Sequence, residues 1–143
     1  MKPVKRSVSC AIFRPEQPAQ VLAVQRPADD EDLPDAWGLP AASLRPGEDW
    51  TDAVRRAGRE KLGVELDVGA ELRRGSLERA AYTLEMRLLQ ASILAGEPGV
   101  PQPDPAVTQY AAWKWAAPAE LAPAAARGSL CSRLLLEYTG DIE

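Results

Sequence analysis

The sequence predicts a mixed α+β (α/β) fold in which helices pack on a mixed β-sheet. Two observations predict it. Short runs rich in β-branched and apolar residues suit strands near the N-terminus and in the middle of the chain, whereas apolar residues at helical spacing occupy 49–62 and 130–138. Strands are thus interrupted by one helix and followed by another, as expected when helices cover a sheet. A length of 143 residues fits one domain, 1–143.

The first elements follow from local residue patterns. Residues 7–13 and 20–25 predict the two strands of a hairpin, with a turn at 14–19. The segment 26–37 is acidic and contains two prolines, so it predicts a loop. Acidic runs are usually solvated, and we favour that interpretation over a role in ligand or metal binding.

A helix is predicted at 49–62, because its apolar residues fall near helical spacing and Gly63 provides a C-terminal stop. Residues 72–77 and 82–94 suit antiparallel strands. The later elements are, in order, a proline-rich loop at 96–105, a strand within 107–117, a short helix or turn at 118–128 and an amphipathic helix at 130–138.

Composition excludes several classes of function. The chain has no histidine, which excludes Ser-His-Asp catalysis and His-ligated zinc. A net charge of -4 argues against binding to a nucleic acid polymer. No apolar stretch is long enough to span a membrane, so the default compartment is the cytoplasm. Cys10 and Cys131 are expected to be small buried hydrophobic residues, with a bridge between them the less favoured alternative.

The segment 41–64, AASLRPGEDWTDAVRRAGREKLGV, carries a recognisable pattern. It resembles the Nudix hydrolase signature, G-x5-E-x7-R-E-U-x-E-E-x-G-U, in which U is a bulky aliphatic residue. Gly63 and Val64 match the end of the signature, Arg56 its arginine and Glu48 the acid before that arginine. The preceding run WGLPAASL is similar to the W-x-L-P-G-G run of the family, with alanines in place of both glycines.

This resemblance implies an α/β/α sandwich with a loop and helix at about 41–63. In the family, glutamates of the helix hold magnesium on the pyrophosphate of a nucleoside diphosphate linked to another group, and water attacks a phosphorus atom. Carboxylates at positions 57, 60 and 61 of a helix would share one face. Such a face supplies the hard oxygen ligands that magnesium prefers. Many members are dimers, so a homodimer is one expected state.

Only one of the three carboxylates is present. Glu60 occupies the first position of the acidic pair, whereas Lys61 and Ala57 occupy the other two acidic positions and Gly58 the aliphatic one. An ammonium about 6 Å from a divalent ion opposes it by about 5 kcal/mol at an effective dielectric of 20, and by about 1.4 kcal/mol in water. We therefore expect magnesium to bind weakly or not at all, with Glu60 as the remaining ligand.

Two functions remain open for a nucleotide-like small-molecule ligand, and a third alternative is an interaction domain with no small-molecule role. The first is a magnesium-dependent pyrophosphohydrolase of reduced or lost power, in which Glu60, Glu48 and Arg56 are the catalytic candidates and a loop acid, Glu97 or Asp104, assists. The second is a binding module that turns nothing over and in which Lys61 contacts phosphate directly as a fixed cation. The alternative for Lys61 is an orientation toward solvent.

Other candidates have simpler interpretations beside the functional ones. Arg26 follows the second strand and could contact a phosphate, but an exposed arginine there needs no such role. Gln109 occupies, by resemblance, the place of a further glutamate of the family, and we count it as a ligand-binding candidate. We expect Glu48 and Arg56 to form a structural pair that joins the loop to the helix. We favour this interpretation about two to one over a direct chemical role for either residue. Trp113 and Trp115 alternate on one strand and should share a face.

Overall fold

A seven-stranded mixed sheet forms the centre of the computed structural model, which describes residues 2–142. The strands are β1 (Val4–Arg14), β2 (Gln17–Gln25), β3 (Trp37–Gly38), β4 (Ala41–Ser43), β5 (Glu65–Glu78), β6 (Thr83–Ala95) and β7 (Ala112–Ala116). Their order is β3-β2-β1-β6-β5, with β4 also paired to β1 and β7 to β2. The β1–β6 pair is parallel and the other pairs are antiparallel.

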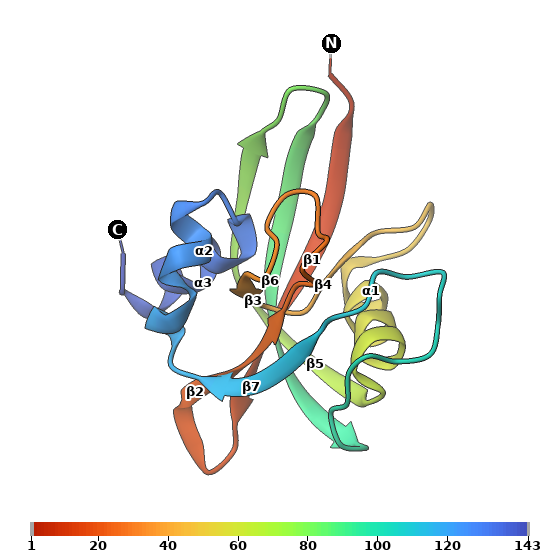
Figure 1. The fold of residues 1–143 in the computed structure, drawn as a ribbon, viewed down its shortest axis with the longest axis vertical. Helices are drawn as coiled ribbons and strands as arrows, with labels where there is room; N and C mark the ends of the chain where they lie inside the picture. The colour runs from red at the N-terminus through yellow and green to blue at the C-terminus, as the bar shows by residue number, and fades with distance from the viewer. Residues whose placement is uncertain (1, 143) are drawn as a thin grey trace.

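Helices cover both faces of this sheet (Figure 1). On one face, α1 (Trp50–Ala57) continues into a π-helical turn, Gly58–Leu62. On the other face, a 3₁₀ turn (Pro118–Leu121) leads into α2 (Ala122–Ala126) and α3 (Leu130–Thr139). Each helical layer has its own core against the sheet. The expected α/β/α sandwich is therefore confirmed. Among residues 2–142, no helix is long and apolar enough to cross a membrane.

Strand β1 separates the two cores by the alternation of its side chains. Val8, Cys10 and Ile12 pack into the core beneath α1, whereas Ala11 packs into the core beneath α3. Cys131 of α3 belongs to the second core. Both cysteines are buried and free, as predicted. Burial raises the pKa of the Cys10 thiol to about 12, so that thiol is protonated at neutral pH.

The predicted helix at 49–62 is present, but its last turn is wider than an α-helical turn. Asp49 caps the start, since its side chain accepts a hydrogen bond from the backbone N–H of Asp52 at 2.7 Å. Gly63 ends it with a left-handed φ of 72°. The helix therefore has a sequence-encoded beginning and end, while the π-helical geometry of its last turn is a feature that periodicity did not predict.

Gly58 stands at the junction of α1 and the π-helical turn because the sheet approaches closely there. A Cβ atom added to Gly58 would lie 2.7 Å from Cδ1 of Leu66 on β5. Such a contact would force the helix away from the sheet or distort the core. The intrinsic cost of glycine in a helix, about 1 kcal/mol relative to alanine, is thus offset by tight packing at this position.

Four predicted element boundaries need correction. The hairpin turn is only Pro15–Glu16, because β1 and β2 extend further than 7–13 and 20–25. Residues 41–43 are not loop but the short strand β4, and the loop toward α1 begins after them. Strand β5 is much longer than 72–77 and carries irregularities in its register with β6. Strand β7 occupies only the second half of 107–117.

Candidate functional site

Arg56 of α1 is the centre of a charged cluster that joins the helix to the preceding loop. Its Nε and Nη2 atoms donate to the two carboxylate oxygens of Glu48, both at 2.9 Å. Nη2 also donates to the carbonyl of Ser43 at 2.7 Å. The side chains of Arg56 and Glu48 are each 14% exposed. The hydrogen bond from Arg56 holds the pKa of Glu48 below its usual value. The expected structural pair is therefore present, and it is bidentate.

Glu60 belongs to the same cluster, and both of its oxygens are already paired. Oε1 accepts from Nη1 of Arg56 at 3.0 Å, and Oε2 accepts from Nη2 of Arg45 at 3.1 Å. Its side chain is 21% exposed. The carboxylate that the signature would assign to metal binding is thus neutralised by two guanidinium groups.

Lys61 points inward, not toward solvent. Its Nζ donates to the carbonyl of Ala41 at 2.8 Å and lies 5.2 Å from the centroid of the Tyr110 ring. Tyr110 is buried, and its hydroxyl accepts from the backbone N–H of Ala41 at 2.9 Å. Among residues 2–142, no carboxylate lies within ion-pair distance of Nζ. The ammonium therefore has one strong acceptor and retains donors for another molecule.

The surroundings of Lys61 disfavour its charged form. Burial lowers its pKa to about 8, and the positive charges of Arg26 and Arg56 act in the same direction, whereas Glu60 opposes them. At neutral pH the side chain is still mainly an ammonium. An anion in contact with Nζ would stabilise this charge, so the site is complementary to negative ligands.

The magnesium that the resemblance implies does not fit the donors of this helix. Position 57 carries an alanine that is 2% exposed, position 61 carries a cation, and Glu60 is paired on both oxygens. Within the described part of the chain, no group of three or more acidic, histidine or cysteine side chains could hold a metal ion. Hard cations need several oxygen ligands with little competing positive charge nearby.

A cleft of about 290 Å³ opens beside Lys61. It is walled by β1, β4, the segment 26–32, the hairpin between β5 and β6, and residues 108–110. Four basic side chains line it together with two acidic ones, in a chain of net charge -4. The basic side chains are Lys5, Arg26, Lys61 and Arg79, and the acidic ones are Asp30 and Asp32. The cleft therefore concentrates positive charge on an acidic protein.

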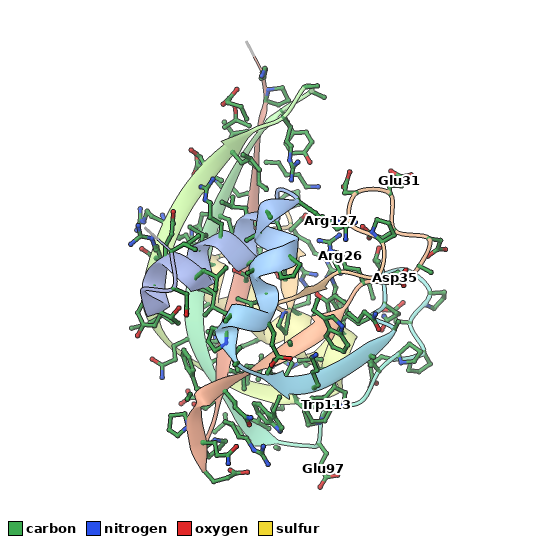
Figure 2. All side chains as sticks on the ribbon, turned by 60° about the vertical axis from the view of Figure 1, so that its left-hand side comes forward. Arg26, Glu31, Asp35, Glu97, Trp113 and Arg127 are labelled. Atoms are coloured by element: carbon green, nitrogen blue, oxygen red, sulfur yellow. The ribbon has the colours of Figure 1, made fainter. Side chains whose placement is uncertain are left out.

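Arg26 lies in this cleft, beside the acidic loop (Figure 2). Its Nη1 is 3.1 Å from each carboxylate oxygen of Asp30. Asp30 also accepts from the backbone N–H of Leu33 at 2.8 Å. Burial raises the pKa of Asp30, but these hydrogen bonds more than offset it and the pKa lies below its usual value. The acidic loop is thus not merely solvated, because Asp30 anchors it and it forms one wall of the cleft.

Gln109 fixes the loop before β7 and leaves little of its amide free. Oε1 accepts from the backbone N–H of Gln102 at 2.9 Å. Nε2 donates toward the carbonyls of Glu60 at 3.3 Å, Asp104 at 3.2 Å and Val107 at 3.4 Å. The contact with Glu60 ties the loop before β7 to the π-helical turn.

The two loop acids considered as helpers differ in position. The carboxylate of Asp104 accepts from the backbone N–H of Ala106 at 2.9 Å, so it stabilises its own loop. Glu97 points away from the molecule at the end opposite the acidic loop that carries Glu31 (Figure 2). Neither lines the cleft.

Trp113 and Trp115 share a face as predicted, with ring centroids 5.8 Å apart and both rings packed on the core beneath α1.

Several residues of the site were not among the sequence candidates. Tyr110, Arg45, Lys5 and Arg79 carry no motif signal, and their roles depend on how distant segments meet. The one available hint was the position of Tyr110 next to Gln109 in the segment that the resemblance already placed near the helix.

A sequence profile described as the NUDIX domain matches residues 3–135. This match covers most of the 143 residues and includes the cluster, the helix and the cleft. The chain therefore belongs to the NUDIX domain family. Members of this family bind nucleotide-derived small molecules and generally use a divalent metal such as Mg²⁺. A comparison with curated protein sequences gave no match.

Solved structures are similar to this chain over most of its length. For a NUDIX hydrolase from Nitrosomonas europaea, the TM-score is 0.74 at 17% identity, covering 98% of this chain and 90% of that one. For a MutT NUDIX hydrolase from Burkholderia pseudomallei, it is 0.67 at 26% identity, covering 82% and 86%. An ADP-ribose pyrophosphatase from Streptococcus suis gives 0.59 at 18% identity, covering 80% and 75%. These likenesses support the Nudix fold of this chain.

Proposed function

We propose that this NUDIX-family protein binds a phosphorylated, nucleotide-like ligand in the cleft through Lys61, without a metal ion on the helix, and that its hydrolytic power is low or lost. The observation that carries the proposal is the position of Lys61. Its ammonium occupies the place of a family carboxylate, faces the cleft and has no anionic partner among residues 2–142. A nucleoside diphosphate derivative is the ligand class most consistent with the family.

The negative charge of a phosphate can be neutralised in two ways at this helix. In the family, magnesium supplies positive charge that carboxylates hold in place. Here a lysine supplies positive charge directly, while Arg26 stands in the same cleft. Two unit charges about 4 Å apart attract by about 4 kcal/mol at an effective dielectric of 20. A fixed ammonium is thus strong enough to bind phosphate, although it does not activate a water molecule as a metal does.

Reduced hydrolysis is the second part of the proposal and rests on Glu60. Both of its oxygens accept hydrogen bonds from arginines, so metal binding would require Arg45 or Arg56 to release one of them. Glu48 is similarly held by Arg56. Catalytic roles for Glu60, Glu48 and Arg56 would therefore depend on rearrangement of this cluster.

Gln109 would act in ligand binding only through the loop that it stabilises. A homodimer and a cytoplasmic location stay predictions from the sequence.

Thermal unfolding in the presence of ligands tests the binding part. Purified protein would be melted with ADP, ADP-ribose and other nucleoside diphosphate sugars, each with magnesium and each with EDTA. We expect at least one of them to raise the melting temperature by the same amount in both conditions, because the ligand binds without metal. Stabilisation that requires magnesium would contradict the proposal. Release of phosphate or mononucleotide from the same compounds measures turnover, and rapid magnesium-dependent release would contradict the second part.

A further inference from the structure

A second cavity lies on the α1 face of the sheet, outside the cleft. It is a groove of about 380 Å³ between β5, β6 and the first residue of α1, Trp50. The long strands β1, β5 and β6 extend beyond α1 here, so the helix leaves this part of the sheet uncovered (Figure 1). The groove is large enough for a small molecule.

The sheet itself separates this groove from the cleft. Side chains alternate between the two faces of β6. Leu84 packs into the core beneath α3 and borders the cleft. Glu85 and Arg87 point to the other face, where the guanidinium carbon of Arg87 lies 4.2 Å from the centroid of the Trp50 ring. A ligand in the groove would therefore contact neither Lys61 nor Arg26.

Two arginines lie side by side on neighbouring strands in the groove. Arg74 of β5 and Arg87 of β6 are direct cross-strand partners. Like charges at such positions destabilise a sheet unless they are compensated. Glu71 is their shared counter-ion: it accepts from Arg74 at 2.8 and 3.0 Å, but Nε of Arg87 is 3.5 Å from its nearest oxygen. One carboxylate thus serves two guanidinium groups.

Arg87 has fewer hydrogen-bond partners than Arg74. It has no hydrogen bond to protein within residues 2–142, although its side chain is only 33% exposed and its guanidinium lies over the Trp50 ring. Glu85, which also borders the groove, has a cation of its own, since Nε of Arg6 lies 3.9 Å from Oε1. Arg6, Arg74 and Arg87 with Glu71 and Glu85 therefore carry a net charge of +1 in this part of the sheet.

We propose that this groove is a second ligand site, which binds the phosphate or carboxylate group of a small molecule between Arg74 and Arg87, with Trp50 as its wall. The guanidinium of Arg87 lies over the Trp50 ring, and its planar set of donors can engage two oxygens of an anion at once. The hydroxyl of Ser76, cross-strand from Glu85, borders the same groove. Glu85 would accept a hydrogen bond from a hydroxyl or ammonium group of the same ligand. This site does not depend on the function proposed for the cleft.

NMR titration of the full chain tests the site. The ¹⁵N-labelled protein would be titrated separately with inorganic phosphate and with acetate, following the indole N–H signal of Trp50 and the Nε–H signal of Arg87. We expect a saturable shift of both signals, with the tighter anion identifying the group that the site prefers. Arg87→Gln should weaken this binding by about tenfold or more, and Arg87→Lys by less, because lysine keeps the charge but loses the planar fork.

Two control variants show whether anion binding is specific to the groove. Arg59→Gln is matched to the groove variants, because Arg59 is an exposed arginine paired through two atoms with Glu65 but lies outside the groove. It should leave the Trp50 titration unchanged, as should Lys61→Met in the cleft. The proposal is overturned if the anions shift only cleft signals, or if Arg87→Gln and Arg59→Gln weaken binding equally. It is also overturned if the shifts do not saturate.

Discussion

Arg56 and Lys61 are two cations of one helical segment, and their surroundings differ. Arg56 donates to Glu48, Glu60 and a backbone carbonyl, so its charge is cancelled within the protein. Lys61 donates to one carbonyl, that of Ala41, and faces the cleft. The comparison teaches that the partners of a charged group, and not its place in a motif, decide whether it stabilises the fold or is available to a ligand.

Removal of Arg56 should have the largest effect on stability. Arg56→Ala leaves two partly buried carboxylates, Glu48 and Glu60, without their shared cation. We expect a loss of about 3 to 4 kcal/mol in the free energy of unfolding, measured by urea denaturation. The matched control is Arg55→Ala, because Arg55 is an exposed arginine of the same helix that pairs with the exposed Asp52, and should cost less than about 1 kcal/mol. Equal losses for both variants would show that the cluster is not structural.

The pH dependence of stability distinguishes the two cations further. The pKa of Lys61 is about 8 in the folded protein, below its ordinary 10.5. Between these values the unfolded chain binds more protons than the folded one, so stability rises with pH across the window. At about 1.4 kcal/mol per pKa unit, and with some solvent screening, we expect a gain of about 2 to 3 kcal/mol from pH 8 to 10.5. Denaturation of wild type and Lys61→Met at each pH measures it.

Subtraction of the two curves removes the titration of other groups, because Lys61→Met lacks only this amine. Parallel curves would contradict the lowered pKa. Affinity for an anion in the cleft should change in the opposite direction. It should fall as pH rises above about 8, since the ammonium that we propose as the ligand contact is lost. A rise in stability together with a fall in affinity is therefore the signature of Lys61.

Ligand affinity should depend on Lys61 more than on any other lysine. For the nucleotide that stabilises the protein most, Lys61→Met should weaken binding by ten- to a hundredfold, about 1.4 to 2.8 kcal/mol, measured by calorimetry. The fold should survive, because methionine retains most of the side-chain volume. Lys114→Met is the control, since Lys114 pairs with Glu120 outside the cleft. Similar affinities for both variants would mean that Lys61 does not contact the ligand.

The sequence was sufficient for the elements that carry strong periodic patterns. The helix at 49–62, the hairpin and the C-terminal helix were predicted because their apolar positions repeat over many residues. The strands β3 and β4 were not, since two or three residues are too few to show alternation. The contacts of Gln109 with the π-helical turn and with its own loop were not predicted either, since no periodicity encodes them.

The site was predicted only in outline. The motif places Glu48, Arg56, Glu60 and Lys61 close together, and the Glu48–Arg56 pair followed from their spacing. The sequence left open whether Lys61 points inward, because that depends on the distance to the carbonyl of Ala41, twenty residues away. The pairing of Glu60 with Arg45 had no signal either, since loop arginines are common and usually solvated.

Ala57 and Lys61, which stand where the family signature has acids, should limit turnover only in part. Lys61→Glu with Ala57→Glu would remove a repelling charge and restore two carboxylates to the family positions. We expect a gain of about tenfold in magnesium-dependent release of phosphate or nucleotide from nucleoside diphosphate derivatives, about 1.4 kcal/mol of transition-state stabilisation. The gain is limited because Glu60 stays paired with two arginines and Ala57 is buried. Gln109→Glu should not add to this gain, since the Nε2 of Gln109 faces three carbonyl oxygens that a carboxylate would repel.

Single substitutions at position 61 separate the causes of any gain. Lys61→Glu alone avoids the buried position 57, so it separates a loss of folding from a failure to bind metal. Lys61→Gln removes the charge without adding a ligand, and should give a smaller gain than Lys61→Glu, because relief of repulsion does not replace coordination. If wild type turns over strongly and each change at 61 abolishes that turnover, then Lys61 is part of a working site. The two cations of the helix would then differ as a structural arginine and a catalytic lysine, and not as a structural arginine and a ligand-binding one.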